Sequence, residues 1–222
     1  MKITTLSIFA VGSLIATTAM ADYTGLSQDG MMDNDDGTWT TRIYANFSEE
    51  SDQLNAVFGN ADSPLTISSS SGFYQHAFGG ATSASINPAL YDAFPSLRMD
   101  SWVSIGLEDN VGNNMLDIGI NWDDFENNGG AISTDNGTWF ATPDDDQVTA
   151  GADLRVLIGQ FTTFINDSSH EYGIFGVINL QGKQGDFETF QEFDVVFDFT
   201  FPAPGALALL GLAGVASRRR RK

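Results

Sequence analysis

Two histidines are the side chains of this sequence best suited to catalysis. His76 and His170 lie in segments rich in aromatic residues and serines. A Ser–His–acid triad or a metal site could use them, but the chain has neither a Gly-x-Ser-x-Gly turn nor a His-x-x-x-His spacing. We therefore expect ordinary loop histidines, and we predict no catalytic residues and no residues that bind an organic cofactor.

Cysteine is absent from the chain. This excludes disulfides, thiolate nucleophiles, and zinc or iron–sulfur sites built on cysteine. A protein of this composition must be held together by its hydrophobic core or by bound ions.

Carboxylates offer a second kind of chemistry. Calcium takes oxygen ligands from loops, and the candidates for such a site are Asp33, Asp35, Asp144 and Asp146. The first pair does not complete an EF-hand loop, because Gly37 occupies the fifth position. Our main expectation is no cofactor and a solvated acidic surface, with calcium as the alternative.

The distribution of charge limits the partners. All 29 acidic residues lie between Asp22 and Asp198, a stretch that contains only four basic residues. Such a surface repels nucleic acid and anionic lipid, so we expect no nucleic-acid partner and no pore-forming role. Two carboxylates could also act as a glycosidase pair, but among 29 acids a pair carries no information.

Aromatic side chains could instead bind sugars by stacking. The four tryptophans are Trp39, Trp102, Trp122 and Trp139. In a β-sandwich a tryptophan is more often part of the core than a platform for a ligand. A polysaccharide is therefore an expected partner without assigned binding residues.

The elements that position these residues are predicted to be strands. Short segments with alternating apolar residues recur, separated by turn residues, and helical periodicity is almost absent. The expected strands are 38–47, 53–59, 65–67, 98–107, 115–122, 136–143, 155–164, 172–180 and 190–201. This pattern predicts a single antiparallel β-sandwich of jelly-roll type, with a barrel as the second choice.

Several local expectations accompany this fold. We expect loops at 22–37 and 123–130, and a helical turn after Asn87 that Pro95 ends. Strands 98–107 and 115–122 should form one hairpin, and strands 155–164 and 172–180 another. In the last strand, Phe193, Val195, Phe197, Phe199 and Phe201 should share one face.

The N-terminus has the three parts of a signal peptide. Lys2 precedes a mostly apolar stretch at 3–15, and Ala19 and Ala21 flank Met20 as a small-x-small cleavage site. The apolar run is short for a bilayer span of about 20 residues. We therefore favour a cleaved signal-peptide helix over an uncleaved anchor.

The C-terminus combines a proline pair, an apolar segment and a cluster of bases. Pro202 and Pro204 precede residues 205–217, which form an apolar helix of marginal length for a bilayer core of about 30 Å. The five final cations should stay cytoplasmic. The simplest interpretation is a plain membrane anchor.

These features resemble the PEP-CTERM sorting signal. The matching residues are Pro202, Pro204, Gly205, Leu207 to Leu212, Arg218, Arg219, Arg220 and Arg221. Ala203 stands where that family usually has Glu. The resemblance implies signal peptidase and an exosortase-type enzyme as partners, transient anchoring in the inner membrane, and a destination at the cell surface or in an extracellular biofilm matrix.

The sequence thus predicts three regions. Residues 1–21 are the signal peptide, 22–201 an acidic all-β extracellular domain, and 202–222 the sorting segment. The middle region is similar to planctomycete exported proteins of unknown function, which supply no site residues. We expect a non-catalytic binding or structural module, and the alternative is a secreted carbohydrate-active enzyme on the same scaffold.

The cleavage site gives a direct prediction. The exported protein should begin at Asp22, because cleavage follows Ala21. N-terminal sequencing of the protein recovered from outside the cytoplasm checks this. A sequence beginning at Met1 would contradict it.

Overall fold

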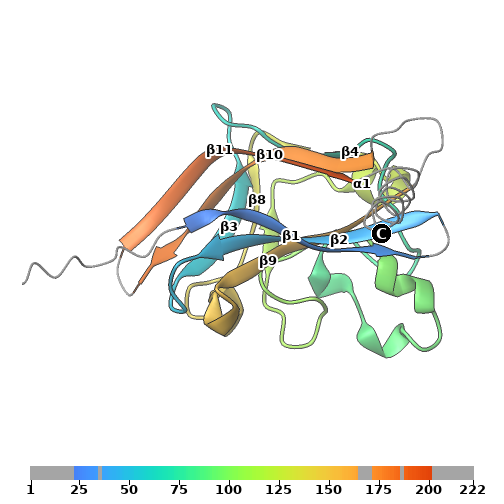
Figure 1. Ribbon diagram of the computed structural model, residues 1–222, viewed down its shortest axis with the longest axis horizontal. Helices are drawn as coiled ribbons and strands as arrows, with labels where there is room; N and C mark the ends of the chain where they lie inside the picture. Colours follow the sequence, from blue (N-terminus) through green and yellow to red (C-terminus); the bar gives the residue numbers. More distant parts are fainter. Residues whose placement is uncertain (1–22, 35–36, 165–171, 186–187, 202–222) are drawn as a thin grey trace, which may run out of the picture.

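The computed structural model describes residues 23–34, 37–164, 172–185 and 188–201 (Figure 1). The predicted signal peptide, the predicted sorting segment and His170 lie outside these residues. Within the described ranges, no helix is both long and apolar enough to cross a membrane.

The domain consists of two antiparallel sheets packed face to face, as predicted (Figure 1). The first sheet has the order β1-β2-β9-β5. Its strands are β1 (Tyr23–Asp33), β2 (Thr38–Phe47), β9 (Arg155–Phe164) and β5 (Trp102–Val103).

The second sheet is organised around a long strand, β10 (Tyr172–Gln184). One edge of β10 pairs with β11 (Glu188–Phe201), and β3 and β4 pair with it one after the other. Outside these two, β8 pairs with β3, β7 with β4, and β6 with β8. The remaining strands are β3 (Gln53–Gly59), β4 (Leu65–Ser69), β6 (Leu116–Ile118), β7 (Ile132–Thr134) and β8 (Gly137–Phe140).

Helices are short and lie in the connections. The only α-helix of the described residues is α1 (Asp123–Asn128). The 3₁₀ turns are η1 (Ser83–Ser85), η2 (Pro88–Leu90), η3 (Pro95–Met99), η4 (Asp146–Val148) and η5 (Gly151–Asp153). As predicted, Asn87 caps its turn, accepting a hydrogen bond from the Ala89 amide. Pro95 does not end that turn but begins η3, because proline fits the first helical position.

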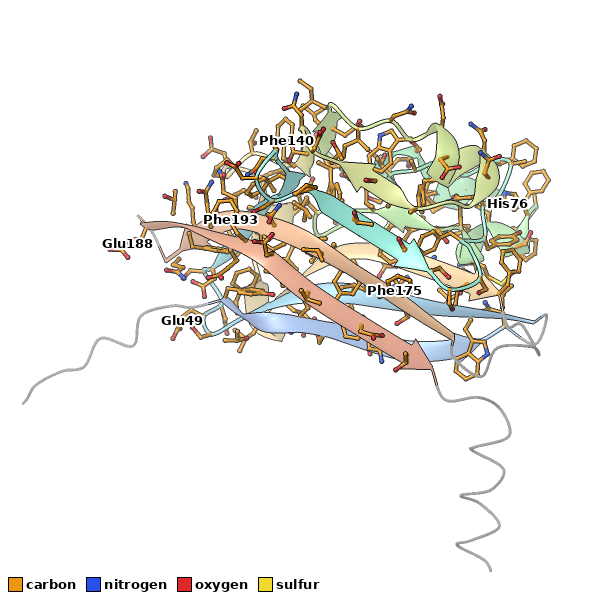
Figure 2. The ribbon with its side chains drawn as sticks, turned by 90° about the horizontal axis from the view of Figure 1, so that it is seen from above. Glu49, His76, Phe140, Phe175, Glu188 and Phe193 are labelled. Atoms are coloured by element: carbon orange, nitrogen blue, oxygen red, sulfur yellow. The ribbon has the colours of Figure 1, made fainter. Side chains whose placement is uncertain are left out.

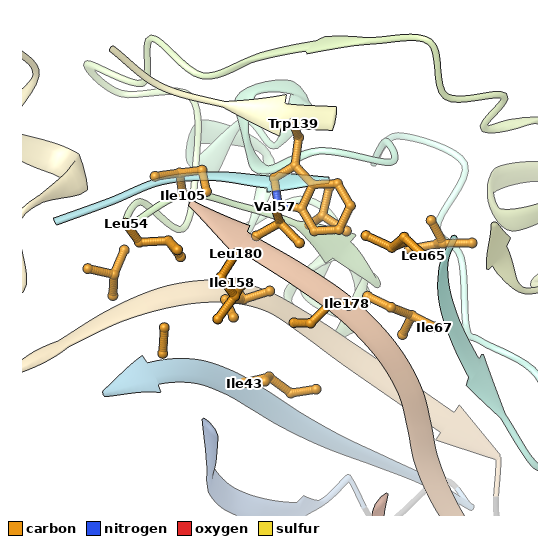
Figure 3. Packing of buried hydrophobic residues seen from close by; sticks show 14 of the residues in the cluster. Ile43, Leu54, Val57, Leu65, Ile67, Ile105, Trp139, Ile158, Ile178 and Leu180 are labelled. Carbon is orange, nitrogen blue, oxygen red and sulfur yellow. The ribbon is translucent and has the colours of Figure 1, made fainter. Parts of the chain in front are cut away.

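The core lies between the sheets (Figure 3). Along β2, Ile43, Ala45 and Phe47 are buried and alternate with half-buried residues. Strand β9 is buried from Val156 to Thr163, because it lies between β2 and β5 and is covered on both faces. The strand expected at 155–164 is confirmed with the same bounds.

Two local predictions are wrong. Residues 22–37 contain strand β1, whose polar residues suit an edge strand that pairs only with β2. Residues 123–130 contain helix α1, which buries Phe125 and ends at Gly129 with φ 64°. In both segments a tertiary contact decides the structure, and the local sequence looks like a loop.

Both predicted hairpins are also wrong. β5 belongs to the first sheet and β6 to the second. Likewise β9 pairs with β2 and β5, whereas β10 pairs with strands of the opposite sheet. The expected strand at 98–107 is reduced to β5, since η3 occupies its first residues. Alternation identifies a strand but does not choose its partner.

A bulge in β11 changes which face its residues occupy. Asp194 has φ 53°, and the register with β10 shifts at this point. Val195, Phe197 and Phe199 pack on the core as predicted, but Phe193 lies on the opposite face, 47% exposed. The side chain of Phe201 is not among the described ones.

Asn179 holds this bulge and the junction between β3 and β4. It is fully buried, and its Nδ2 donates to the carbonyl oxygens of Phe58 at 2.8 Å and Ser63 at 2.7 Å. Its Oδ1 accepts from the Asp194 amide at 2.9 Å. One side chain on β10 thus connects three neighbouring segments of the second sheet.

This arrangement predicts a large loss of stability for Asn179→Ala. Three hydrogen bonds of about 1 kcal/mol each disappear and leave buried backbone groups unpaired, so the free energy of unfolding should fall by about 3 kcal/mol. Urea unfolding measures the change. The matched control is Asn127→Ala at an exposed position, expected to change stability by less than about 0.5 kcal/mol. Equal effects of the two substitutions would contradict the role of Asn179.

Candidate binding groove

The outer face of the second sheet exposes apolar side chains. Of the nine large hydrophobic residues exposed in the described part of the chain, five belong to strands of this sheet: Leu116, Ile118, Phe175, Phe193 and Val196. Figure 2 looks onto this face and shows Phe140, Phe175 and Phe193 spread over it. Exposed apolar side chains gathered on one face of a sheet indicate a site of interaction.

A groove runs across this face. Its larger part is a hollow of about 460 Å³ lined by residues of β3, β8, β10 and β11 and by the segment after β8: Asn55, Ala56, Phe58, Thr138, Phe140, Ala141, Thr142, Pro143, Gln181, Gly182, Lys183 and Thr189. A second hollow of about 320 Å³ shares Phe58 and Thr138 with it. The two hollows therefore lie next to each other, and together they make up the groove.

Strand order explains why aromatic rings meet here. Phe58 on β3 pairs with Thr138 on β8, and Ala56 pairs with Phe140. Cross-strand neighbours share a face, so the rings lie beside short side chains. Phe193, which the Asp194 bulge turns outward, contacts Phe58 edge to face at 5.7 Å between ring centroids.

A second bulge places Asn55 in the groove. Gln181 pairs with Ala56 and Gly182 with Leu54, so Asn55 is an extra residue on β3. Leu54 and Val57 remain in the core, whereas Asn55 lines the groove. Asn55 is 8% exposed, and its Nδ2 has no hydrogen-bond partner within the described residues.

Among the described residues, no carboxylate lines either part of the groove, and Lys183 is the one charged residue there. General acid–base chemistry and two-carboxylate hydrolysis both need acids at the substrate. The arrangement suits binding: ring faces for apolar contact, and amides and hydroxyls for hydrogen bonds.

A third hollow, of about 340 Å³ on the first sheet, is lined by three acids and two arginines. Arg42 makes two bonds of 2.6 Å to the Glu108 carboxylate. Arg155 bonds Asp29 at 3.1 Å and lies 4.1 Å above the ring of Tyr44. These cations already have partners, so we do not assign a ligand there.

Asp100 is the acid most changed by its surroundings. It is fully buried, and its oxygens accept hydrogen bonds from the backbone amides of His76 at 2.6 Å and Gly80 at 3.1 Å. Burial raises the pKa of Asp100 to about 7, although these amides act to lower it. Burial also raises the pKa of Glu126. Asp100 thus fastens the loop 76–80 to η3 and faces no groove.

The predicted site residues do not come together. His76 accepts a hydrogen bond from the Phe78 amide through Nδ1, within its own loop. Asp144 and Asp146 are exposed, and the described residues contain no cluster of three or more His, Asp or Glu placed to hold a metal. The side chains of Asp33 and Asp35 lie outside the description, as do Ala19, Ala21 and the sorting residues.

The aromatic residues of the groove were not predicted from the sequence. Trp102 and Trp139 are 2% and 0% exposed and belong to the core, as expected for a sandwich. Trp39 and Trp122 are partly buried and do not line the groove. The available signal was the alternation in β3 and β8, which places Phe58 and Phe140 opposite Val57 and Trp139.

Comparison with known proteins yields little. No family model matches the chain, and no curated protein matches it. Among solved structures, a collagen-binding domain from a Staphylococcus aureus adhesin aligns over 82% of this chain and 99% of that domain, with 12% identity and a TM-score of 0.35. A TM-score this low does not establish a common fold.

The raised pKa of Asp100 predicts a pH-dependent contribution to stability. The folded state keeps its proton up to about pH 7, whereas the ordinary pKa is 3.8. The stabilisation is therefore complete below about pH 4 and is lost as pH rises through 7, by up to about 4 kcal/mol. Asn cannot ionise, so the stability difference between wild type and Asp100→Asn should shrink over this range in urea titrations.

The control for this titration is Asn127→Ala, which removes no ionisable group and lies at an exposed position. Its difference from wild type should stay nearly constant from pH 4 to pH 8. A constant difference for Asp100→Asn as well would show that Asp100 does not titrate in this range.

Proposed function

We propose that this protein is an exported, non-catalytic binding module that holds a polysaccharide of the cell surface or extracellular matrix in the groove of its second sheet. The observation that carries the proposal is the lining of the groove. Phe58 and Phe140 provide ring faces, and amide and hydroxyl side chains surround them. Sugars present apolar C–H faces and polar hydroxyl edges, which match this combination.

The absence of acids from the groove favours binding over hydrolysis. A glycosidase needs two carboxylates on either side of the bond it cleaves. Neither lining contains an Asp or Glu, and fully buried Asp100 cannot reach a substrate. These observations support the non-catalytic interpretation over the alternative of a carbohydrate-active enzyme.

The shape of the groove favours a chain molecule. Its two hollows lie on either side of Phe58 and Thr138, so a polymer that crosses these residues would contact both. A protein partner would cover about 800 Å² of this domain's surface, which includes flat areas outside the groove. A polysaccharide chain needs only the groove itself. Binding of a protein and of no glycan is therefore the outcome that would replace this proposal.

Export and sorting complete the proposal. The N-terminal pattern would direct the chain to signal peptidase, and the segment 202–222 to an exosortase-type enzyme after transient anchoring in the inner membrane. The mature domain would then act at the cell surface or in the matrix. The acidic surface is compatible with a soluble matrix component.

A glycan array with the purified protein tests the proposal, with calcium in one set and a chelator in the other. We expect binding to a restricted set of polysaccharides. No binding to any glycan in either set would contradict the proposed function.

The groove assignment makes a further prediction. Phe140→Ala and Phe58→Ala should each weaken glycan binding about tenfold or more, because each removes a ring worth about 1.5–3 kcal/mol when covered. Isothermal titration calorimetry with the best ligand of the array measures the change. Phe78→Ala, at a ring 51% exposed outside the groove, is the matched control and should bind normally. Full affinity in both groove variants would place the ligand elsewhere.

A further inference from the structure

We propose that the end of the groove formed by Asn55, Gln181 and Lys183 is a subsite for the carboxylate of a uronic acid residue in the bound polysaccharide. This inference rests on the proposed function and specifies the class of ligand. It follows from the hydrogen-bonding groups that the fold leaves free at this place.

Three acceptors around the subsite are already engaged. Gln181 Oε1 accepts from Gln191 Nε2 at 2.9 Å, and the Pro143 carbonyl accepts from Gln53 Nε2 at 3.2 Å. The Val57 carbonyl accepts from the Thr138 hydroxyl at 2.9 Å. Gln53 Oε1, beside Lys183, is a buried acceptor without a partner among the described residues.

Donors remain available. Asn55 Nδ2 is buried without a partner in the described structure, which destabilises the fold unless a ligand supplies an acceptor. Because Gln181 uses its oxygen for Gln191, its amide nitrogen is the group left for the groove. Lys183 adds an ammonium group with three donors. A ligand for these groups must be rich in acceptors.

The strands bring the three side chains to one place. Gln181 and Lys183 are two residues apart on β10 and line the same hollow. Asn55 is the bulged residue of β3 opposite the Gln181–Gly182 step. The subsite thus depends on regular sheet geometry and one bulge, which fix it more firmly than a loop would.

Charge selects a carboxylate from among the acceptor-rich groups. The four basic residues of the described domain differ in their partners: Arg42 and Arg155 bond to acids, and Arg98 lies 4.3 Å above the ring of Tyr91. Lys183 makes no ion pair with any described residue. A single free cation in a strongly acidic domain suits one carboxylate, whereas the surrounding acids would repel a densely charged polymer.

The test compares two ligands that differ only in one charge: a glucose hexasaccharide in which a single residue is glucuronic acid, and the methyl ester of the same hexasaccharide. Titration calorimetry in physiological salt should show the acid binding wild type about tenfold more tightly than the ester. In Lys183→Met the acid should lose that advantage, and the affinity for the ester should stay the same. Asn55→Asp, which replaces the donor with a carboxylate, should weaken binding of the acid more than of the ester.

Two controls separate the causes. Arg98→Met removes a positive charge outside the groove and should leave the preference for the acid intact. Phe140→Ala should weaken both ligands equally. Equal binding of acid and ester to wild type, or an unchanged preference in Lys183→Met, would overturn the subsite.

Failure of the subsite and failure of the proposed function give different results. If neither hexamer binds while neutral glycans bind in the array, the carboxylate subsite is wrong and the polysaccharide module stands. If no glycan of any kind binds, both fall together.

Discussion

The buried amide of Asn179 is the interaction on which the second sheet depends. It lies on β10, the strand common to β3, β4 and β11, and bonds to the Phe58 and Ser63 carbonyls and the Asp194 amide. Where β3 ends and β4 has not yet begun, the ladder along β10 is interrupted, and backbone groups need other partners. Asn179 supplies them from one fully buried side chain. Its hydrogen bonds fix the position of the β11 bulge relative to the gap between β3 and β4.

Two β-bulges place side chains on the outer face of the second sheet and so help to form the groove. The bulge at Asp194 moves Phe193 to the outer face, beside Phe58. The bulge on β3 does the same for Asn55 without disturbing Leu54 and Val57 in the core. Each adds one residue to one strand, and the added residue changes the face of its neighbours. The candidate site is therefore a consequence of irregular pairing within a regular sheet.

Charge is arranged unevenly in the domain. The arginines are engaged by acids or aromatic rings, and Asp100 is buried in a structural role. Against this acidic background, the groove has no acid and one lysine. The lining of the groove thus differs in charge from the acidic remainder of the surface. This difference suits recognition of a specific ligand.

The sequence by itself determined the fold class and the main strands. Alternation of apolar residues gave the bounds of β2, and short apolar runs between turn residues gave those of β3 and β9. Only the tertiary structure decided that β1 is a strand, that β9 and β10 belong to different sheets, and that Phe193 and Asn55 face outward. The physical reason is that an edge strand gains its stability from backbone bonds to a neighbour, and a bulge arises from register between strands. Neither leaves a pattern in the local sequence, and so the groove could not be foreseen, whereas the core tryptophans could.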